Sequence, residues 1–231
     1  MEFSVASIRR ATPTTRVVRL ALGAARFPFR AGQAALLGAP GGGELAPYSV
    51  ASSPEDVRET GTLEFLVKPD PSSRFAACVT TLRRGDRVTV GGPVGSFTWP
   101  DRPRERHFLF VAGGTGITPL RSMIRHAIAV KQPGRFRLLY AARARDEFAY
   151  LPEFRRLARD GALDLSLTIT RQTGGRWRHG RGRPGADVLR PLVDDPATLC
   201  FLCGPSAMVV ELSDVLRSFG IAANRIRSER W

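Results

Sequence analysis

The stretch VAGGTGITPL (Val111–Leu120) follows an apolar run and precedes a helical pattern, and it decides how the second half of the chain folds. Its three glycines predict a strand-to-helix turn with positive φ, open to close approach by another molecule. Thr118 is the predicted N-cap, and Pro119 suits the first helical position, where no N–H is needed. Free N–H groups at a helix N-terminus attract anions, typically phosphate. The stretch is a candidate phosphate-binding turn, with a purely structural tight turn as the alternative. Because Pro119 replaces the last glycine, the pattern differs from the GxGxxG fingerprint.

A second junction of the same kind lies in CGPSAM (Cys203–Met208), which again places Gly-Pro between an apolar strand and a helical pattern. In a parallel sheet both junctions fall at the carboxyl ends of strands, and ligands bind there, where the strand order reverses. The two junctions together predict a nucleotide site.

Strand and helix patterns alternate after a Pro-rich, charged linker at residues 97–107, which predicts βαβ units around a parallel sheet. The predicted strands span residues 107–114, 136–142, 163–170 and 198–204, with a final extended piece at 224–231. The predicted helices span residues 118–130, 147–161, 186–193 and 205–220.

The first hundred residues instead carry six short apolar or β-branched runs divided by turn signals, which predict a small antiparallel barrel. The predicted strands span residues 3–11, 15–22, 33–39, 46–52, 61–68 and 86–92. One helical piece is expected at residues 74–85, and 52–56 (SSPED) is expected to be a break. The fold class is therefore two-domain, with a barrel at 1–101 and an α/β domain at 102–231.

The formal charge of +14 favours a nucleic-acid binder at first sight. However, lysine occurs only at Lys68 and Lys131, the arginines are scattered, and the one dense cluster is GGRWRHGRGR at residues 174–183. We interpret this cluster as a solvated or cofactor-facing loop rather than an RNA-binding segment. A positive surface also steers acidic protein partners.

Three cysteines are present, and Cys200 and Cys203 form a CxxC, a spacing found in redox and zinc sites. Here the pair falls in a predicted buried strand, where residues three apart point to opposite faces and lie about 10 Å apart, beyond disulfide reach. The chain also lacks four cysteines spaced for an iron–sulfur cluster. An acceptor carrying such a cluster is expected on a separate chain.

The barrel half contains APYSVASSP (Ala46–Pro54), in which Tyr48 and Ser49 pair an aromatic surface with a hydroxyl; a plain strand is the alternative. A barrel with this Tyr-Ser motif, followed by GGTGITP and then CGPxxM, resembles the ferredoxin–NADP reductase family. The resemblance runs from Phe29–Gln33 to the C-terminal residues. It implies a flavin-binding barrel followed by a nicotinamide-nucleotide domain.

The resemblance implies that Tyr48 packs on the isoalloxazine of FAD, that Ser49 hydrogen-bonds near flavin N5, and that residues 72–76 lie near the diphosphate. Trp231 matches a terminal aromatic that covers the flavin and swings aside for nicotinamide; packing on the barrel is the alternative. The flavin-binding residues implied in this way are Pro47, Tyr48, Ser49, Val50, Val67, Lys68, Arg74, Phe75, Ala76 and Trp231.

For the second cofactor, the resemblance places the glycine turn at the diphosphate, Cys203 beside the nicotinamide ring and Glu229 near it. Ser49, Cys203 and Glu229 form the implied catalytic set; a packing role for Cys203 and a solvated Glu229 are the alternatives. NADPH is expected, with NADH as the alternative, because Thr170-Arg171 resembles a Ser-Arg pair of NADP-specific relatives. The implied nucleotide-binding residues are Gly114, Thr115, Gly116, Ile117, Thr118, Arg143, Arg171, Cys203, Gly204, Pro205 and Met208.

One departure from the family concerns the flavin phosphates: Ala46 stands where an arginine is usual. Losing that charge-assisted contact costs about 1.5–3 kcal/mol, roughly 10- to 150-fold in affinity. Arg74 is our candidate for compensation.

The function implied is hydride transfer from NAD(P)H to FAD and then single-electron transfer to a separate, acidic carrier such as a ferredoxin or an oxygenase component. Reduction of free flavin or ferric complexes, and a non-catalytic subunit or sensor with weakened flavin binding, are the alternatives. No signal-like or membrane-spanning apolar run is present, so a cytoplasmic protein with no membrane or nucleic-acid partner is expected.

Overall fold

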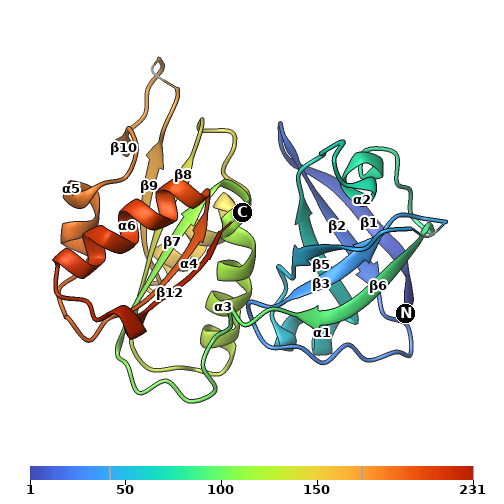
Figure 1. The fold of residues 1–231 in the computed structure, drawn as a ribbon, viewed down its shortest axis with the longest axis horizontal. Helices are drawn as coiled ribbons and strands as arrows, with labels where there is room; N and C mark the ends of the chain where they lie inside the picture. Colours follow the sequence, from blue (N-terminus) through green and yellow to red (C-terminus); the bar gives the residue numbers. More distant parts are fainter. Residues whose placement is uncertain (42, 173, 231) are drawn as a thin grey trace. The chain divides into compact units, whose positions relative to one another are not determined.

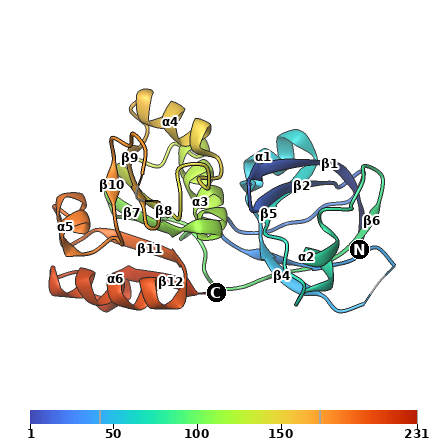
Figure 2. The same cartoon turned by 90° about the horizontal axis from the view of Figure 1, so that it is seen from above.

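The computed structural model describes residues 1–41, 43–172 and 174–230, and the chain forms two compact units (Figures 1 and 2). The first unit comprises Met1–Trp99 together with Arg121–Val130. The second unit comprises Pro100–Leu120 and the chain from Lys131 onward. Within the described ranges, none of the helices has the length and apolarity that crossing a bilayer requires.

A six-stranded antiparallel sheet builds the first unit, in the order β4-β3-β6-β1-β2-β5. The strands are β1 (Glu2–Thr12), β2 (Thr15–Ala21), β3 (Ala34–Gly38), β4 (Ala46–Ser49), β5 (Thr62–Val67) and β6 (Arg87–Val94). Each coincides with one of the six predicted runs. Apolar side chains at alternate positions, such as Leu63, Phe65 and Val67 of β5, fill the interior.

The two edge strands of this sheet meet, which closes the barrel. Val50, just after β4, forms an antiparallel bridge with Phe65 of β5, and the Ala51 N–H donates to the Glu64 carbonyl at 2.7 Å. Closure removes the unpaired edges that an open sheet would present. The predicted antiparallel barrel is confirmed.

Helix α1 (Pro54–Thr60) occupies the segment that the sequence analysis takes as a break. Ser53 caps it: its hydroxyl accepts from the Asp56 N–H, and the Asp56 carboxylate accepts from the Ser53 N–H. Pro54 starts the first turn and Gly61, at φ +64°, ends the helix. The helix was missed because it is only seven residues long and buries a single apolar side chain. Helix α2 (Arg74–Cys78) is shorter than the predicted helical piece.

A buried ionic contact also belongs to the first unit. Glu64 of β5 is 5% exposed, and its carboxylate accepts hydrogen bonds from Arg19 at 2.6 Å and from Arg121 at 3.2 Å. Arg121 also donates to the Ala51 carbonyl at 2.8 Å. Pairing with two arginines compensates for the loss of water around this carboxylate.

The second unit is a six-stranded parallel sheet in the order β10-β9-β8-β7-β11-β12. Figure 2 shows α5 and α6 on one face of this sheet and α3 and α4 on the other. The strands are β7 (His107–Gly113), β8 (Arg135–Ala142), β9 (Asp164–Ile169), β10 (Gly180–Arg181), β11 (Leu199–Gly204) and β12 (Ile226–Arg230). The helices are α3 (Ile117–Ala129), α4 (Leu151–Arg159), α5 (Ala186–Leu189) and α6 (Ser206–Ser218), with 3-10 turns at Gly114–Gly116, Arg190–Leu192 and Ala223–Arg225.

The strand order reverses between β7 and β11: the chain runs outward from β7 through β8 and β9 on one side and continues through β11 and β12 on the other. The parallel sheet predicted from the alternating pattern is confirmed. Helix α4 starts four residues later than predicted, because Tyr150 adopts φ +60° and the preceding Ala149 N–H donates to the Tyr140 hydroxyl.

Candidate functional site

Two strand-to-helix junctions flank the point where the strand order reverses, and their glycines pack directly on each other. A Cβ on Gly116 would lie 2.5 Å from the Cys203 carbonyl carbon, and a Cβ on Gly204 would lie 3.1 Å from Gly113 Cα. A Cβ on Gly113 would lie 2.8 Å from Pro205 Cδ. Glycine is therefore required here for contact between the junctions, and the two predicted nucleotide segments lie together.

The turn between β7 and α3 differs from the predicted N-cap geometry. Residues 114–116 form a 3-10 turn that leads directly into α3 at Ile117, so Thr118 already lies inside the helix. Its hydroxyl donates to the Thr115 carbonyl at 2.6 Å. The prediction that Thr118 is the N-cap is thus wrong, because the 3-10 turn moves the start of the helix toward Gly113. Of the turn glycines, only Gly114 has a positive φ, at +55°.

Access to this turn is limited to two residues. Gly114 and Thr115 are partly exposed, whereas Gly116, Ile117 and Thr118 are buried. The accessible backbone at this junction therefore belongs to Gly114 and Thr115.

Tyr140 supports the turn through its hydroxyl, a role that was not predicted from the sequence. Its hydroxyl donates to the Gly114 carbonyl at 3.2 Å and accepts from the Ala149 N–H at 3.2 Å. Complete burial raises the pKa of this phenol, so it stays protonated and keeps both hydrogen bonds. A tyrosine in the otherwise apolar strand FRLLYAA was the only signal for such a role.

Cys203 and Glu229 lie directly opposite each other on β11 and β12, at the carboxyl ends of both strands. The thiol donates to Glu229 Oε2 at 3.9 Å. Burial raises the pKa of the half-buried Glu229 carboxyl, and burial followed by the neighbouring carboxylate raises the pKa of the Cys203 thiol. The structure thus pairs two of the three predicted catalytic residues beside the glycine junctions.

The other half of the CxxC lies on the opposite face of β11, where Cys200 is buried with Leu202 against α6. All three cysteines are free thiols. Within the described ranges, no group of three or more His, Cys, Asp or Glu side chains is arranged to hold a metal ion.

Arg143 and Arg171 follow the carboxyl ends of β8 and β9, and the Arg171 N–H donates to the Arg143 carbonyl at 3.0 Å. Both arginines are exposed. Pro205, at the other junction, is also exposed, and Met208 is half-buried against Gly113 and Gly204.

In the barrel, one hydrogen bond joins two segments that the sequence analysis assigns to the flavin. The Tyr48 hydroxyl of β4 lies 2.7 Å from the Ser73 hydroxyl, which also caps α2 by accepting from the Ala76 N–H. The Tyr48 ring packs edge-on against Phe75 at 5.2 Å. Partial burial raises the pKa of the Tyr48 phenol. Ser73 lies in a segment expected to border the flavin phosphates but was not singled out.

The predicted flavin residues divide into two groups by exposure. Pro47, Lys68 and Arg74 are exposed, and Tyr48 and Ser49 are half-buried. The side chains of four others belong to the barrel core, so only their backbone can contact a ligand: Val50, Val67, Phe75 and Ala76. Trp231 lies outside the described residues.

Arg74 lies beside the turn that leads into β4. Its guanidinium is so close to Gly43 that a Cβ added there would collide with it. Gly43 precedes Ala46, the position of the missing arginine, by three residues. A cation is therefore present near this part of the barrel.

Comparison with known proteins matches both halves of the chain. Residues 2–99 match the model of an oxidoreductase FAD-binding domain, and residues 110–214 match that of an oxidoreductase NAD-binding domain. The chain is 32% identical to ferredoxin–NADP reductase B of Sorangium cellulosum, over 89% of this chain and 86% of the relative. It is 34% identical to methane monooxygenase component C of Methylosinus trichosporium, over 70% of this chain but only 49% of that relative.

Among solved structures, the cytochrome P450 reductase GcoB of Amycolatopsis superposes on the whole chain with a TM-score of 0.87 and 26% identity, over 69% of its own length. This structural match agrees with the two domain matches and with the ferredoxin–NADP reductase from Sorangium cellulosum. The chain belongs to the ferredoxin–NADP reductase family, as an oxidoreductase that uses FAD and a nicotinamide dinucleotide.

Proposed function

We propose that this enzyme passes electrons from NADPH through FAD to a separate one-electron carrier protein, such as a ferredoxin or an oxygenase component. The observation that carries the proposal is the Cys203–Glu229 pair at the carboxyl ends of β11 and β12, next to the interlocked glycine junctions. FAD held by the barrel would supply the chemistry of accepting a hydride from the reduced nicotinamide and releasing the electrons singly.

The residues present fit a nicotinamide dinucleotide. Gly114 and Thr115, which are partly exposed, would meet its diphosphate at the point where the strand order reverses. In our proposal, the Cys203 thiol and the Glu229 carboxyl orient the nicotinamide. Burial raises the pKa of Glu229, so this carboxyl keeps its proton to a higher pH than an exposed glutamate does.

The barrel residues also fit FAD. Tyr48 offers a half-buried ring held by Ser73 and Phe75, and the hydroxyl of Ser49 follows it on β4. Arg74 supplies the cation that Ala46 lacks, at the turn before the same strand. We assign Tyr48 to the flavin ring, Ser49 to its polar edge and Arg74 to the diphosphate.

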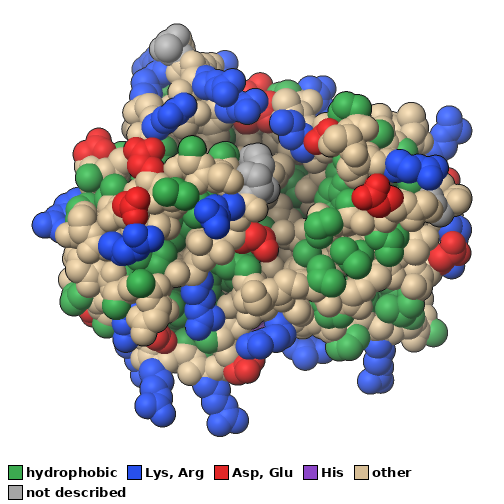
Figure 3. All heavy atoms as spheres, in the orientation of Figure 1, with side chains coloured by type: hydrophobic (Ala, Val, Ile, Leu, Met, Phe, Trp, Pro, Cys, Tyr) green, Lys and Arg blue, Asp and Glu red, His purple; other side chains and the backbone are tan. Residues whose placement is uncertain are grey.

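The partner proposed is an acidic electron carrier. Lys and Arg side chains outnumber Asp and Glu by 35 to 21, and Figure 3 shows them over both units. The curated relatives include a ferredoxin–NADP reductase and a methane monooxygenase component. A net positive surface accelerates the encounter with an acidic protein at low ionic strength.

NADPH is the proposed donor because Arg143 and Arg171, which follow β8 and β9, are both exposed and are joined through their backbones by a hydrogen bond. Paired guanidinium groups bind phosphate with charge-assisted hydrogen bonds, and a 2′-phosphate distinguishes NADPH from NADH.

The test starts from the purified protein with FAD. NADPH should bleach the visible flavin bands, and reoxidation should be faster with a ferredoxin than with free flavin or a ferric chelate. The variant Glu229→Gln should slow the bleaching about tenfold or more, whereas Glu211→Gln, an exposed carboxylate on α6, should leave it unchanged. A flavin that stays oxidised with both nucleotides contradicts the proposal. A higher kcat/KM for free flavin than for every carrier tested assigns the protein to the free-flavin reductases instead.

A further inference from the structure

Two consecutive side chains of α3 hold two consecutive carbonyl groups of the first unit. Arg121 donates from Nη1 to the Ala51 carbonyl at 2.8 Å, and the Ser122 hydroxyl donates to the Ser52 carbonyl at 2.7 Å. All four residues are buried and belong to the same compact unit. Because a buried carbonyl that loses its donor is costly, these two hydrogen bonds fix where residues 51 and 52 lie.

The segment held in this way continues the strand that carries the proposed flavin contacts. Ser49 is the last residue of β4 and precedes Ala51 by two positions. An extended chain advances about 3.3 Å per residue, so the Ser49 Cα lies within roughly 7 Å of the held residue. The place of the Ser49 hydroxyl therefore depends on the contacts of Ala51.

Arg121, Ala51 and Glu64 form a closed set of contacts. The Arg121 guanidinium donates from the same Nη1 to the Glu64 carboxylate at 3.2 Å, and the Ala51 N–H donates to the Glu64 carbonyl at 2.7 Å. The Glu64 N–H in turn donates to the Ser52 hydroxyl at 3.1 Å. A charge-assisted hydrogen bond inside such a set resists displacement of any one member.

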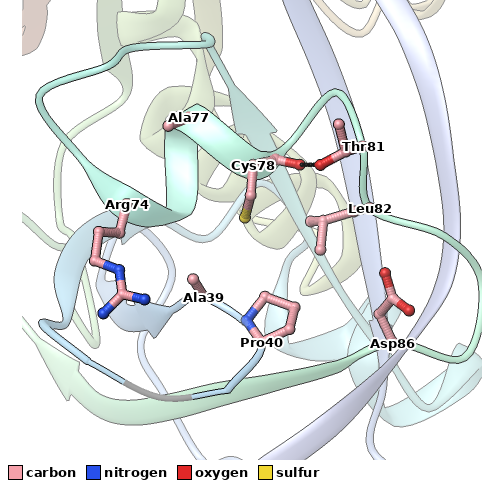
Figure 4. Close-up of a pocket in the computed structure, with 8 residues that line it drawn as sticks. All are labelled: Ala39, Pro40, Arg74, Ala77, Cys78, Thr81, Leu82 and Asp86. Atoms are coloured by element: carbon pink, nitrogen blue, oxygen red, sulfur yellow. Dashed lines mark hydrogen bonds between the residues drawn. The ribbon is translucent and has the colours of Figure 1, made fainter.

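Arg121 differs in its surroundings from Arg74, the arginine that we assign to the flavin diphosphate. Arg74 is exposed and lines a surface groove of about 580 Å³ (Figure 4). Arg121 is only 7% exposed and directs its Nη1 at two protein acceptors. It is therefore placed to act on a flavin through the backbone of Ala51 and not by direct contact.

We propose that Arg121 is a positioning residue for hydride transfer, which sets the place of the Ser49 hydroxyl by holding the Ala51 carbonyl. This inference rests on the proposed function, in which Ser49 meets the polar edge of the flavin. A misplacement of about 1 Å far from the reacting atoms can cost about a hundredfold in rate. Loosening this strand end should therefore slow hydride transfer while the cofactors still bind.

Three variants separate positioning from a merely structural role. Arg121→Met keeps a long side chain and removes the donors. Arg121→Lys keeps one charged nitrogen, which suffices because Nη1 alone makes both contacts. Arg125→Met is the matched control, since Arg125 lies one turn further along α3 and pairs with Asp56 of α1, away from residues 51 and 52.

Stopped-flow reduction of the FAD-loaded protein at saturating NADPH gives the rate. Arg121→Met should slow it at least about tenfold, and Arg121→Lys should restore it to within about threefold of the parent. The Kd values for FAD and NADP⁺ should stay within about twofold of the parent in both variants. Without any NADPH, the visible flavin bands should shift in Arg121→Met only. Arg125→Met should lower Tm but keep the parental rate and spectrum.

A parental rate and spectrum in Arg121→Met overturns the inference, and so does equal slowing in Arg125→Met. A raised Kd for FAD with a parental rate at saturating FAD also overturns it, because Arg121 then serves binding. If Arg121→Met does not fold, Ser122→Ala replaces it and should slow reduction at least about threefold at parental Kd values; a parental rate there overturns the inference. A parent flavin that NADPH leaves oxidised refutes the proposed function, and the spectra of bound flavin then decide the role of Arg121 alone.

Discussion

The contact between the two glycine junctions gives the sharpest prediction about stability. In Gly116→Ala the new Cβ would lie 2.5 Å from the Cys203 carbonyl carbon and 2.8 Å from the Gly204 nitrogen. Overpacking usually costs about 1–3 kcal/mol. Because these neighbours are backbone atoms of the buried strand β11, which cannot rotate away, we expect a loss at the upper end, about 3 kcal/mol. For a chain of this length that loss lowers Tm by about 6–12 °C.

Two further variants turn this prediction into a series. Gly113→Ala meets the side chains of Met208 and Pro205, of which the methionine can move, so its loss should be smaller. Gly174→Ala has no neighbour within 4 Å and should stay within about 0.5 kcal/mol of the parent.

The assay is thermal unfolding by calorimetry, combined with the affinity for NADP⁺. We expect Tm to fall in the order Gly174, Gly113, Gly116, and the Gly116→Ala variant to bind NADP⁺ more weakly while the barrel still binds FAD. A Gly116→Ala protein with parental Tm and parental NADP⁺ affinity would show that the two junctions are not in contact, and the reasoning about this site would be wrong.

Three other predictions concern single charges. Arg74→Ala should weaken FAD binding roughly 10- to 150-fold in a fluorescence titration, and unchanged affinity would show that Arg74 does not replace the missing cation. Arg171→Ala should lower kcat/KM for NADPH at least about tenfold but spare NADH, and equal losses would refute a 2′-phosphate contact. The hydrogen bond from Arg137 lowers the pKa of Asp194, so the stability from this pair is present above the ordinary Asp pKa and is lost as the pH falls below it. Asp194→Asn should cost about 1 kcal/mol at neutral pH, since Asp194 is half exposed, and should flatten the acid limb of the stability curve; an unchanged acid limb in urea titrations would contradict this.

Patterns with a clear period predicted the fold well. The apolar alternation in the first hundred residues gave all six barrel strands, and the alternation of strands and helices gave the parallel sheet and its switch point. The exceptions are elements too short to have a period. Helix α1 carries its signal in the capping box of Ser53 and Asp56, with Pro54 between them, and β10 has only two residues.

The site was predictable at the level of segments but not of contacts. GGTG and CGP indicate a nucleotide site because glycine and proline punctuate strand ends. That Gly116 is required by a carbonyl of β11 depends on two segments almost ninety residues apart in the chain, and nothing local encodes it. The same holds for the hydrogen bond between Tyr48 and Ser73, which are 25 residues apart in the chain.

The contacts of Glu64 show that the domain boundary cannot be drawn at a single point in the sequence, because residues far apart in the chain meet at this carboxylate. Glu64 lies in β5 beside the bridge that closes the barrel, and its buried carboxylate accepts from Arg19 and Arg121. Arg19 belongs to the segment matched by the FAD-binding model, but Arg121 follows the nucleotide turn and lies outside that segment. Residues 1–101 alone would lack Arg121, and with it one hydrogen bond and one positive charge at this carboxylate. The barrel unit is therefore completed by part of α3, the helix that follows the 3-10 turn at Gly114–Gly116.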